Sequence, residues 1–267
     1  MALQEKAERL QSILRSYGQV ALAFSGGVDS SLLLRCALDS LGAGNILVLN
    51  ARSCLQKPHE RERVDSWFVR HGPGDGVQQV FVDLQPLAWP EFVRNPEDRC
   101  YLCKCRLYRL FLDEAGRRGI TRLIDGTNAD DMQSQRPGLR AISEFGVGTP
   151  LAAAGLSKEN VRSLSRERGL DTWDQPSSSC LATRIPHGLE VTADRVRLIA
   201  ALEQDLERLG FAGCRVRLDR HDAATVLVQL RHSDLERFGR RLQQDNITRF
   251  FHDSGMKNVY LDLQGRC

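Results

Sequence analysis

Residues 20–31 read Val-Ala-Leu-Ala-Phe-Ser-Gly-Gly-Val-Asp-Ser-Ser, an apolar run that stops at two glycines and is followed at once by a helical pattern. The run Val20–Phe24 has the length and composition of a buried strand. A strand that turns on paired glycines into a helix leaves several backbone N–H groups directed at one point, where the helix dipole adds positive charge. The stretch therefore predicts a phosphate-binding loop in which Gly26 and Gly27 allow close approach of the phosphate.

Polar side chains of this loop add to the predicted phosphate site. The hydroxyls of Ser25, Ser30 and Ser31 are further donors, and Asp29 is suited to hold Mg²⁺ on the phosphates. The stretch is not a Walker loop, because that loop requires a Gly-Lys-Ser/Thr sequence that is absent here. It also lacks the third glycine of the dinucleotide-binding fingerprint. The alternative, a tight strand–helix turn without a ligand, does not explain why these residue types gather at one junction.

Size and composition limit the class of protein. The 267 residues suffice for one large domain or for a domain with a smaller partner. A net charge of +3 falls short of what a dedicated nucleic-acid binder carries. We find no apolar stretch of membrane-spanning length and no signal-peptide core, so we expect a cytoplasmic protein that binds neither membranes nor nucleic acid.

Strand-like runs alternate with helical stretches over the first half of the chain. This alternation predicts an α/β fold, a doubly wound parallel sheet with helices on both faces. Ligands of such sheets bind beyond the carboxyl ends of the strands, where we expect Asn50, Gly126 and Asn128 to line the same site as the loop. The expected strands are Val20–Phe24, Ile46–Asn50, Val80–Asp83 and Arg122–Asp125, and the expected helices are Val28–Leu41, Glu60–Arg70 and Tyr101–Arg118.

From Thr192 onward the sequence mixes helix and strand patterns in a way that is typical of a small α+β domain. We place the boundary near Gly188, which predicts a first domain of residues 1–188 and a second of residues 189–267. The expected elements of the second domain are a helix to Leu209, strands Cys214–Leu218 and Thr225–Leu230, a helix from Ser233 to about Asp253, and a strand Asn258–Leu263.

Three of the eight cysteines are candidates for chemistry. Cys100 and Cys103 form a Cys-x-x-Cys pair, whose spacing lets two thiolates bind one metal or cluster iron. No second such pair completes a zinc site, and a redox pair lacks the thioredoxin-type context. If Cys180 converges with this pair, one iron of a [4Fe–4S] cluster is left without a protein ligand. The other five are expected to be ordinary reduced residues: Cys36, Cys54, Cys105, Cys214 and Cys267.

Cys180 and two arginines carry further predictions. Cys180 lies beside Arg184 and three serines, a polar and cationic setting that lowers the pKa of a thiol and favours a nucleophile over an inert loop residue. Cys180 and Arg184, with Asp29 of the phosphate loop, are therefore the candidate catalytic residues. Arg215 and Arg217 alternate along an expected strand and so share one face. Two arginines on one face suit a phosphate, although a solvated strand face has the same spacing.

Several segments together resemble one family. The loop Ser25–Ser30 matches the Ser-Gly-Gly-x-Asp-Ser sequence of the PP-loop ATP pyrophosphatases, which have an adenine nucleotide alpha hydrolase-like fold. The segment Pro176–Pro186, which holds Cys180, is similar to that of the LarE family of ATP-dependent sulfur transferases. The sequences Asp125–Asp131 and Arg99–Lys104 add to this resemblance, which runs over most of residues 10–230.

The resemblance implies a reaction. LarE proteins adenylate the carboxylates of pyridinium-3,5-biscarboxylic acid mononucleotide with ATP and convert them to thiocarboxylates for the nickel-pincer cofactor of lactate racemase. It implies that Arg215 and Arg217 bind the substrate phosphate and that Cys180 takes part in sulfur delivery. Sulfur comes either from Cys180 itself, sacrificed to dehydroalanine, or through a [4Fe–4S] cluster, and the Cys100–Cys103 pair favours the cluster. Family members also form homo-oligomers.

One departure and three rival functions stay open. The family usually carries an acidic metal ligand on the strand after the arginines, but residues 223–228 contain no carboxylate. A tRNA thiolation enzyme of the same superfamily would require an RNA-binding domain and a more basic surface. A non-catalytic nucleotide-binding module would not require Asp29, Ser30 and Cys180 together, and amide-forming relatives would not require Cys180.

Overall fold

The computed structural model describes residues 2–72, 75–133, 137–244 and 247–266, so Cys267 lies outside the described residues. The chain forms two compact units, each assembled from three segments. Unit 1 comprises Met1–Ser53, Pro58–Leu84 and Asp98–Gln175, and unit 2 comprises Cys54–Lys57, Gln85–Glu97 and Pro176–Cys267. These units group residues that pack together, and the domain boundary near Gly188 stays a prediction.

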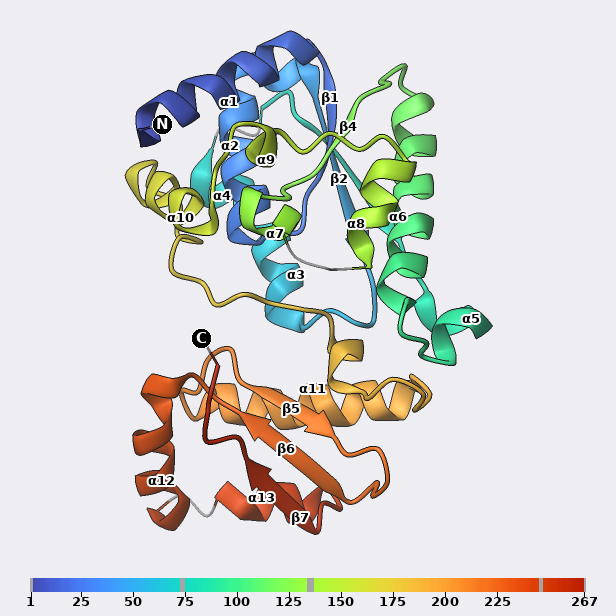
Figure 1. The fold of residues 1–267 in the computed structure, drawn as a ribbon, viewed down its shortest axis with the longest axis vertical. Coiled ribbons are helices and arrows are strands. Elements are labelled where there is room, and N and C mark those ends of the chain that lie inside the picture. Colours follow the sequence, from blue (N-terminus) through green and yellow to red (C-terminus); the bar gives the residue numbers. More distant parts are fainter. Residues whose placement is uncertain (1, 73–74, 134–136, 245–246, 267) are drawn as a thin grey trace. The chain divides into compact units, whose positions relative to one another are not determined.

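A four-stranded parallel sheet lies at the centre of unit 1 (Figure 1). Its strands are ordered β3-β2-β1-β4, and Val20 of β1 pairs with Ile46 of β2. This arrangement confirms the predicted α/β class with a parallel sheet. The strands are β1 (Val20–Ala23), β2 (Ile46–Arg52), β3 (Gln78–Asp83) and β4 (Leu123–Ile124).

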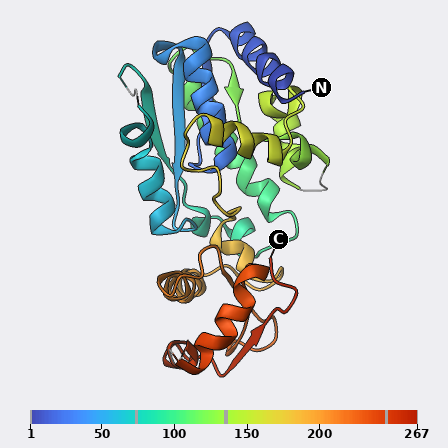
Figure 2. The ribbon, with the colours of Figure 1, turned by 90° about the vertical axis from the view of Figure 1, so that its left-hand side faces the viewer.

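Helices cover both faces of this sheet because successive strand residues are apolar on both sides (Figures 1 and 2). Val20 and Leu22 of β1 belong to one buried cluster with α1 and α2, whereas Ala21 between them packs with Phe111 of α6 on the other face. The helices of unit 1 are α1 (Leu3–Tyr17), α2 (Val28–Leu41), α3 (Pro58–Asp65), α4 (Trp67–His71), α6 (Arg99–Gly116), α7 (Ala129–Gln133), α8 (Gly138–Glu144), α9 (Pro150–Ala153) and α10 (Lys158–Glu167), with a 3-10 turn η1 (Ala43–Asn45).

The helix predicted over Glu60–Arg70 is wrong as a single element. It is divided into α3 and α4 at Ser66, whose φ of −94° and ψ of 2° leave the helical region. The Ser66 hydroxyl donates to the Glu62 carbonyl at 2.6 Å. Such back-bonding by serine often bends a helix, and it accompanies the break here, although the Ser66 N–H also donates to the Glu62 carbonyl at 2.9 Å.

Unit 2 is built around a three-stranded mixed sheet of order β5-β6-β7. β5 is antiparallel to β6, β6 is parallel to β7, and Val216, Val226 and Val228 are fully buried. The elements are β5 (Arg215–Leu218), β6 (Thr225–Gln229), β7 (Asn258–Leu261), α5 (Pro90–Val93), α11 (Ala193–Arg208), α12 (Leu235–Gln244), α13 (Ile247–Asp253) and the 3-10 turns η2 (Pro86–Ala88), η3 (Leu181–Arg184) and η4 (His232–Asp234).

The predicted α+β content of the C-terminal part is therefore present. The long helix expected from Ser233 corresponds to α12 and α13, and residues 245–246 between them lie outside the described residues. Within the described part of the chain, every helix is too short or too polar to cross a membrane.

Candidate functional site

The predicted phosphate loop joins β1 to α2 and has a fixed shape. Gly26 has a φ of +73°, which L side chains rarely adopt, and Gly27 is the extended N-cap of α2. The Ser30 hydroxyl accepts from the Ser25 N–H at 3.3 Å and donates to the Gly27 carbonyl at 3.1 Å. The hydroxyl of Ser31 is buried and has no hydrogen-bond partner among the described residues. The loop thus presents backbone at a helix N-terminus, the geometry of an anion-binding site.

The segment after β4 lies directly against this loop at Gly126. A Cβ added to Gly126 would lie 2.9 Å from the backbone nitrogen of Ser30 and 3.1 Å from the carbonyl carbon of Asp29. Real Cβ atoms do not approach backbone so closely, so only glycine fits without moving the loop. The structure therefore brings Gly126 to the phosphate loop, as its position after a parallel strand predicted.

We expect Gly126→Ala to reduce ATP cleavage to AMP and pyrophosphate by about 100-fold, because the added methyl displaces the backbone that would hold the phosphates. Pyrophosphate release measures the effect, and a thermal melt checks the fold. Gly44→Ala is the matched control, since a Cβ there meets no atom within 4 Å. Wild-type pyrophosphate release by a folded Gly126→Ala protein would contradict the placement of the nucleotide.

Asp29 is held from two sides. Asn128 donates from Nδ2 to Asp29 Oδ1 at 3.0 Å, and the Lys158 ammonium, 129 residues away in sequence, pairs with Oδ2. Lys158 was not predicted, because only tertiary packing brings the start of α10 to this place. No group of three or more His, Cys, Asp or Glu side chains within the described ranges is placed to hold a metal ion. Mg²⁺ binds one or two carboxylates together with substrate phosphates, and its binding to Asp29 stays a prediction.

Asn50 lies at the same edge of the sheet, but both ends of its side chain bond to protein. Its Nδ2 donates to the Phe24 carbonyl at 2.6 Å, and its Oδ1 accepts from Gln79 Nε2 at 2.9 Å. These bonds fix the chain where β1 ends. A contact between Asn50 and a nucleotide stays a prediction.

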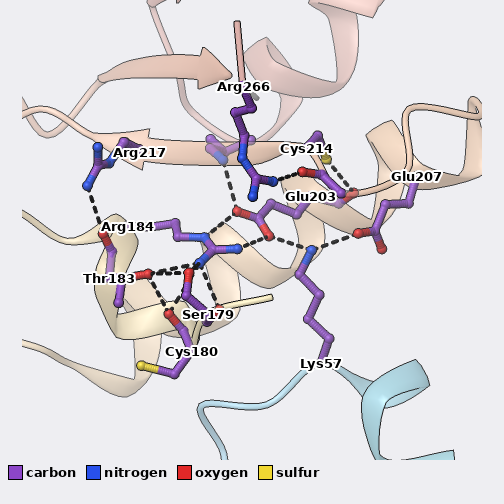
Figure 3. Close-up of polar contacts among 12 residues, drawn as sticks. Lys57, Ser179, Cys180, Thr183, Arg184, Glu203, Glu207, Cys214, Arg217 and Arg266 are labelled. Carbon is purple, nitrogen blue, oxygen red and sulfur yellow. Dashed lines mark hydrogen bonds and ion pairs between the residues drawn. The ribbon is translucent and has the colours of Figure 1, made fainter. Parts of the chain in front are cut away.

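The Cys180 segment belongs to unit 2 and is fixed by Arg184 (Figure 3). Cys180 is exposed and precedes η3, whereas Arg184 at the end of η3 is buried. Arg184 Nη1 donates to the carbonyl of Ser179 at 2.8 Å, to the Ser179 hydroxyl at 2.6 Å and to the Thr183 hydroxyl at 2.9 Å. Arg184 therefore shapes the loop around Cys180, and its predicted catalytic role stays a prediction.

A buried carboxylate, Glu203 of α11, neutralises Arg184 and was not predicted from the sequence. Arg184 Nε donates to Glu203 Oε1 at 2.7 Å, and Lys57 Nζ lies 2.5 Å from Oε2. Burial opposes the charge, but hydrogen bonds and charges from Arg184 and Lys57 outweigh it and lower the pKa of Glu203. One signal was present: Glu203 falls on the apolar face of α11, where Ile199, Leu202 and Leu206 are buried.

Arg215 and Arg217 lie on one face of β5, as predicted, since Val216 and Leu218 between and after them are buried. Arg217 Nη2 donates to the Thr183 carbonyl at 3.2 Å. Burial, together with the charges of Arg266, Arg184 and Arg217, lowers the pKa of Arg215 to about 10. Its Nε is buried and has no hydrogen-bond partner in the described structure. Positive charge is thus concentrated here, and a bound anion would relieve it.

The three candidate cysteines divide between the units. Cys100 and Cys103 lie on α6 in unit 1, with Cys100 exposed and Cys103 half-buried, and Cys180 belongs to unit 2. Thiolates are the donors that iron–sulfur clusters bind, so the donor type fits, but neither unit supplies three of these ligands alone. Among the five cysteines expected to be inert, burial raises the pKa of Cys36 to about 11 and that of Cys214 to about 12.

Comparison with known proteins places these features in a family. No family model matches the chain. An uncharacterized protein of Synechocystis is 33% identical over 98% of this chain and 95% of its own length. A component of the glutamine-hydrolyzing GMP synthase of Thermoplasma volcanium is 28% identical over 78% of this chain and 70% of its own length.

The pyridinium-3,5-bisthiocarboxylic acid mononucleotide synthase of Lactiplantibacillus plantarum is 33% identical over 98% of this chain and 92% of its own length. This similarity spans both units, from the phosphate loop to the strands of unit 2. With the parallel sheet and the loop at the end of β1, it shows that the chain belongs to the family of this synthase, the LarE-type enzymes of the PP-loop superfamily.

Proposed function

We propose that this protein is an ATP-dependent sulfur transferase that converts the carboxylates of pyridinium-3,5-biscarboxylic acid mononucleotide to thiocarboxylates. The product is the precursor of the nickel-pincer cofactor of lactate racemase. The observation that carries the proposal is an exposed cysteine in a hydrogen-bonded polar loop, in a chain that is similar to the synthase over 92% of the synthase's length and also has a phosphate loop. We place the reaction in the cytoplasm and propose a homo-oligomer.

The phosphate loop would carry out the activation step. A substrate carboxylate oxygen attacks the α-phosphorus of ATP, the bond to the β-phosphate bridging oxygen breaks, and pyrophosphate leaves with that electron pair. The backbone at Gly26 and Gly27 and the first turn of α2 would hold the departing phosphates. Asp29, already oriented by Asn128 and Lys158, would hold Mg²⁺, which neutralises charge on the phosphates when bound.

Sulfur would then replace the adenylate at the activated carbonyl carbon. A sulfur nucleophile forms the new C–S bond, and AMP leaves with the electrons of the C–O bond. We propose that Cys180, with Cys100 and Cys103, holds a [4Fe–4S] cluster, which when bound supplies exchangeable sulfide. In the sacrificial alternative the Cβ–Sγ bond of Cys180 breaks with loss of the α-proton, and dehydroalanine remains.

The substrate phosphate would bind Arg215 and Arg217. We expect each alanine replacement to weaken binding of the mononucleotide by about 1.5–3 kcal/mol, the value of a hydrogen bond to a charged group, and to leave ATP binding nearly unchanged. Isothermal titration with each ligand measures this. Arg249→Ala, which removes an exposed arginine of α13, is the control. Equal weakening of both ligands would assign the arginines to ATP instead.

The function itself is tested by incubating the purified protein, under anaerobic conditions, with ATP, Mg²⁺ and pyridinium-3,5-biscarboxylic acid mononucleotide. We expect AMP, pyrophosphate and a product in which oxygen is exchanged for sulfur at the carboxylates, seen by mass spectrometry. AMP formation that does not depend on the mononucleotide, with no sulfur in the product, would contradict the proposal.

A further inference from the structure

A short segment of the chain, Cys54–Lys57, packs in unit 2 although it lies in sequence between β2 and α3 of unit 1. Lys57 is 6% exposed, and its ammonium is held between two carboxylates of α11. Its Nζ lies 2.5 Å from Glu203 Oε2 and 2.7 Å from Glu207 Oε1. Burial opposes this charge, but Glu203 and Glu207 outweigh it and raise the pKa of Lys57. Lys57 is therefore a charged residue in a buried ionic cluster.

Glu203 transmits this contact toward Cys180. Its side chain is fully buried, and each of its two oxygens accepts from more than one donor (Figure 3). Besides Lys57, the donors are Arg184 Nε at 2.7 Å, Arg184 Nη2 at 3.2 Å and the backbone N–H of Val216 at 2.9 Å. On its other side Arg184 Nη1 donates to the Cys180 carbonyl at 3.3 Å. A continuous polar chain thus runs from Lys57 through Glu203 and Arg184 to the backbone of Cys180.

The same segment also contacts the Cys180 loop directly through the backbone. The N–H of Leu181, the residue after Cys180, donates to the carbonyl of Leu55 at 2.9 Å. Two independent ties, one of backbone and one of charge, therefore connect residues 55–57 to the loop. Neither tie involves the Cys180 thiol, which is left exposed.

We propose that Lys57 is a positioning residue for Cys180: its ammonium fixes the Glu203 carboxylate, which fixes Arg184 and with it the loop that presents the thiol. Without Lys57, the charges of Glu203 and Glu207 lose the cation that lies between them. Their mutual repulsion then shifts the Glu203 carboxylate away from the Arg184 guanidinium. The inference rests on the proposed function only in assigning sulfur delivery to Cys180.

The test compares Lys57→Met, of similar length without charge, with Lys57→Arg, which restores the cation, in the full-length protein. We expect Lys57→Met to slow single-turnover sulfur transfer by about 10- to 100-fold, with pyrophosphate release nearly unchanged, because a small misplacement of a reacting group costs this much. Amide hydrogen exchange over residues 179–184 should quicken, and the rate of Cys180 alkylation by iodoacetamide should change. Lys57→Arg should recover most of each effect.

Arg208→Ala serves as the control, because it removes an exposed cation of the same helix α11 that pairs with Asp205, outside the buried cluster. Should Lys57→Met fail to fold, Lys57→Gln, which removes the charge but keeps a hydrogen-bond donor, should give smaller changes in the same direction. Unchanged exchange and alkylation in a folded variant would overturn the proposal. These two measurements need no turnover, so they decide the role of Lys57 even if Cys180→Ala proves that sulfur takes another route.

Discussion

Replacing Cys180 with alanine should abolish sulfur transfer while ATP is still cleaved to AMP and pyrophosphate. The thiol is exposed, and alanine retains the contacts that the loop makes through its backbone and through the side chains of Ser179, Thr183 and Arg184. In the proposed mechanism, adenylation uses the phosphate loop of unit 1 and needs no sulfur. Product sulfur measured by mass spectrometry and pyrophosphate measured by a coupled assay separate the two half-reactions.

The matched control is Cys54→Ala, because Cys54 is another exposed thiol of unit 2. The Cys54→Ala protein should transfer sulfur at the wild-type rate. The mass of Cys180 after turnover then identifies the sulfur source: an intact residue with bound iron and sulfide supports the cluster, and a residue lighter by H₂S supports sacrifice. Sulfur transfer by the Cys180→Ala protein at the wild-type rate would refute the assignment of Cys180.

The second large effect is expected on stability. Glu203→Gln leaves Arg184 buried without its carboxylate and leaves Lys57 with Glu207 alone, and breaking a buried ion pair from one side typically costs about 3–5 kcal/mol. Urea unfolding measures the free energy of unfolding. Glu236→Gln is the control, because Glu236 pairs with Arg240 on the exposed surface of α12. A loss of less than about 1 kcal/mol, as at a surface pair, would show that the cluster is not a stabilising element.

The same cluster gives stability a defined pH dependence. The pKa of Glu203 is lowered in the folded protein, so its contribution is present above the ordinary glutamate pKa and is lost as the pH falls through the folded value. The pKa of Lys57 is raised, so its contribution is present below the ordinary lysine pKa and is lost only as the pH rises through the folded value. Glu203→Gln should therefore flatten the acid limb of the stability curve.

Local sequence patterns predicted the parts of the molecule that depend on neighbouring residues. The apolar run Val20–Phe24 predicted β1, and the glycines that follow it predicted the loop. The parallel strand ends predicted that Gly126 and Asn128 approach this loop. By contrast β3 begins at Gln78 rather than at Val80, because pairing with Leu47 of β2 extends the strand over polar residues. Strand pairing, rather than hydrophobicity, therefore determines where β3 begins.

The ionic partners of the site could not be predicted in the same way. Lys158 meets Asp29 across 129 residues, and Lys57 meets Glu207 across 150. No periodicity connects residues so far apart, and the charge of a lysine in a polar segment is normally solvated. Only a carboxylate on the apolar face of α11 hinted that a buried cation was needed, and it did not identify which one.

The discontinuous make-up of unit 2 has a consequence for dissecting the protein. A fragment of residues 176–267 would lack Lys57 and also Asn95, whose Nδ2 donates to the carbonyls of Pro186 at 2.8 Å and Leu189 at 2.7 Å. During synthesis Lys57 likewise cannot pair with Glu203 and Glu207 until α11 has left the ribosome. Deleting the residues before 176 would therefore remove Lys57, the lysine that pairs with Glu203. A circular permutant opened at Gly44, in the η1 turn, would instead keep all three segments of unit 2 in one chain.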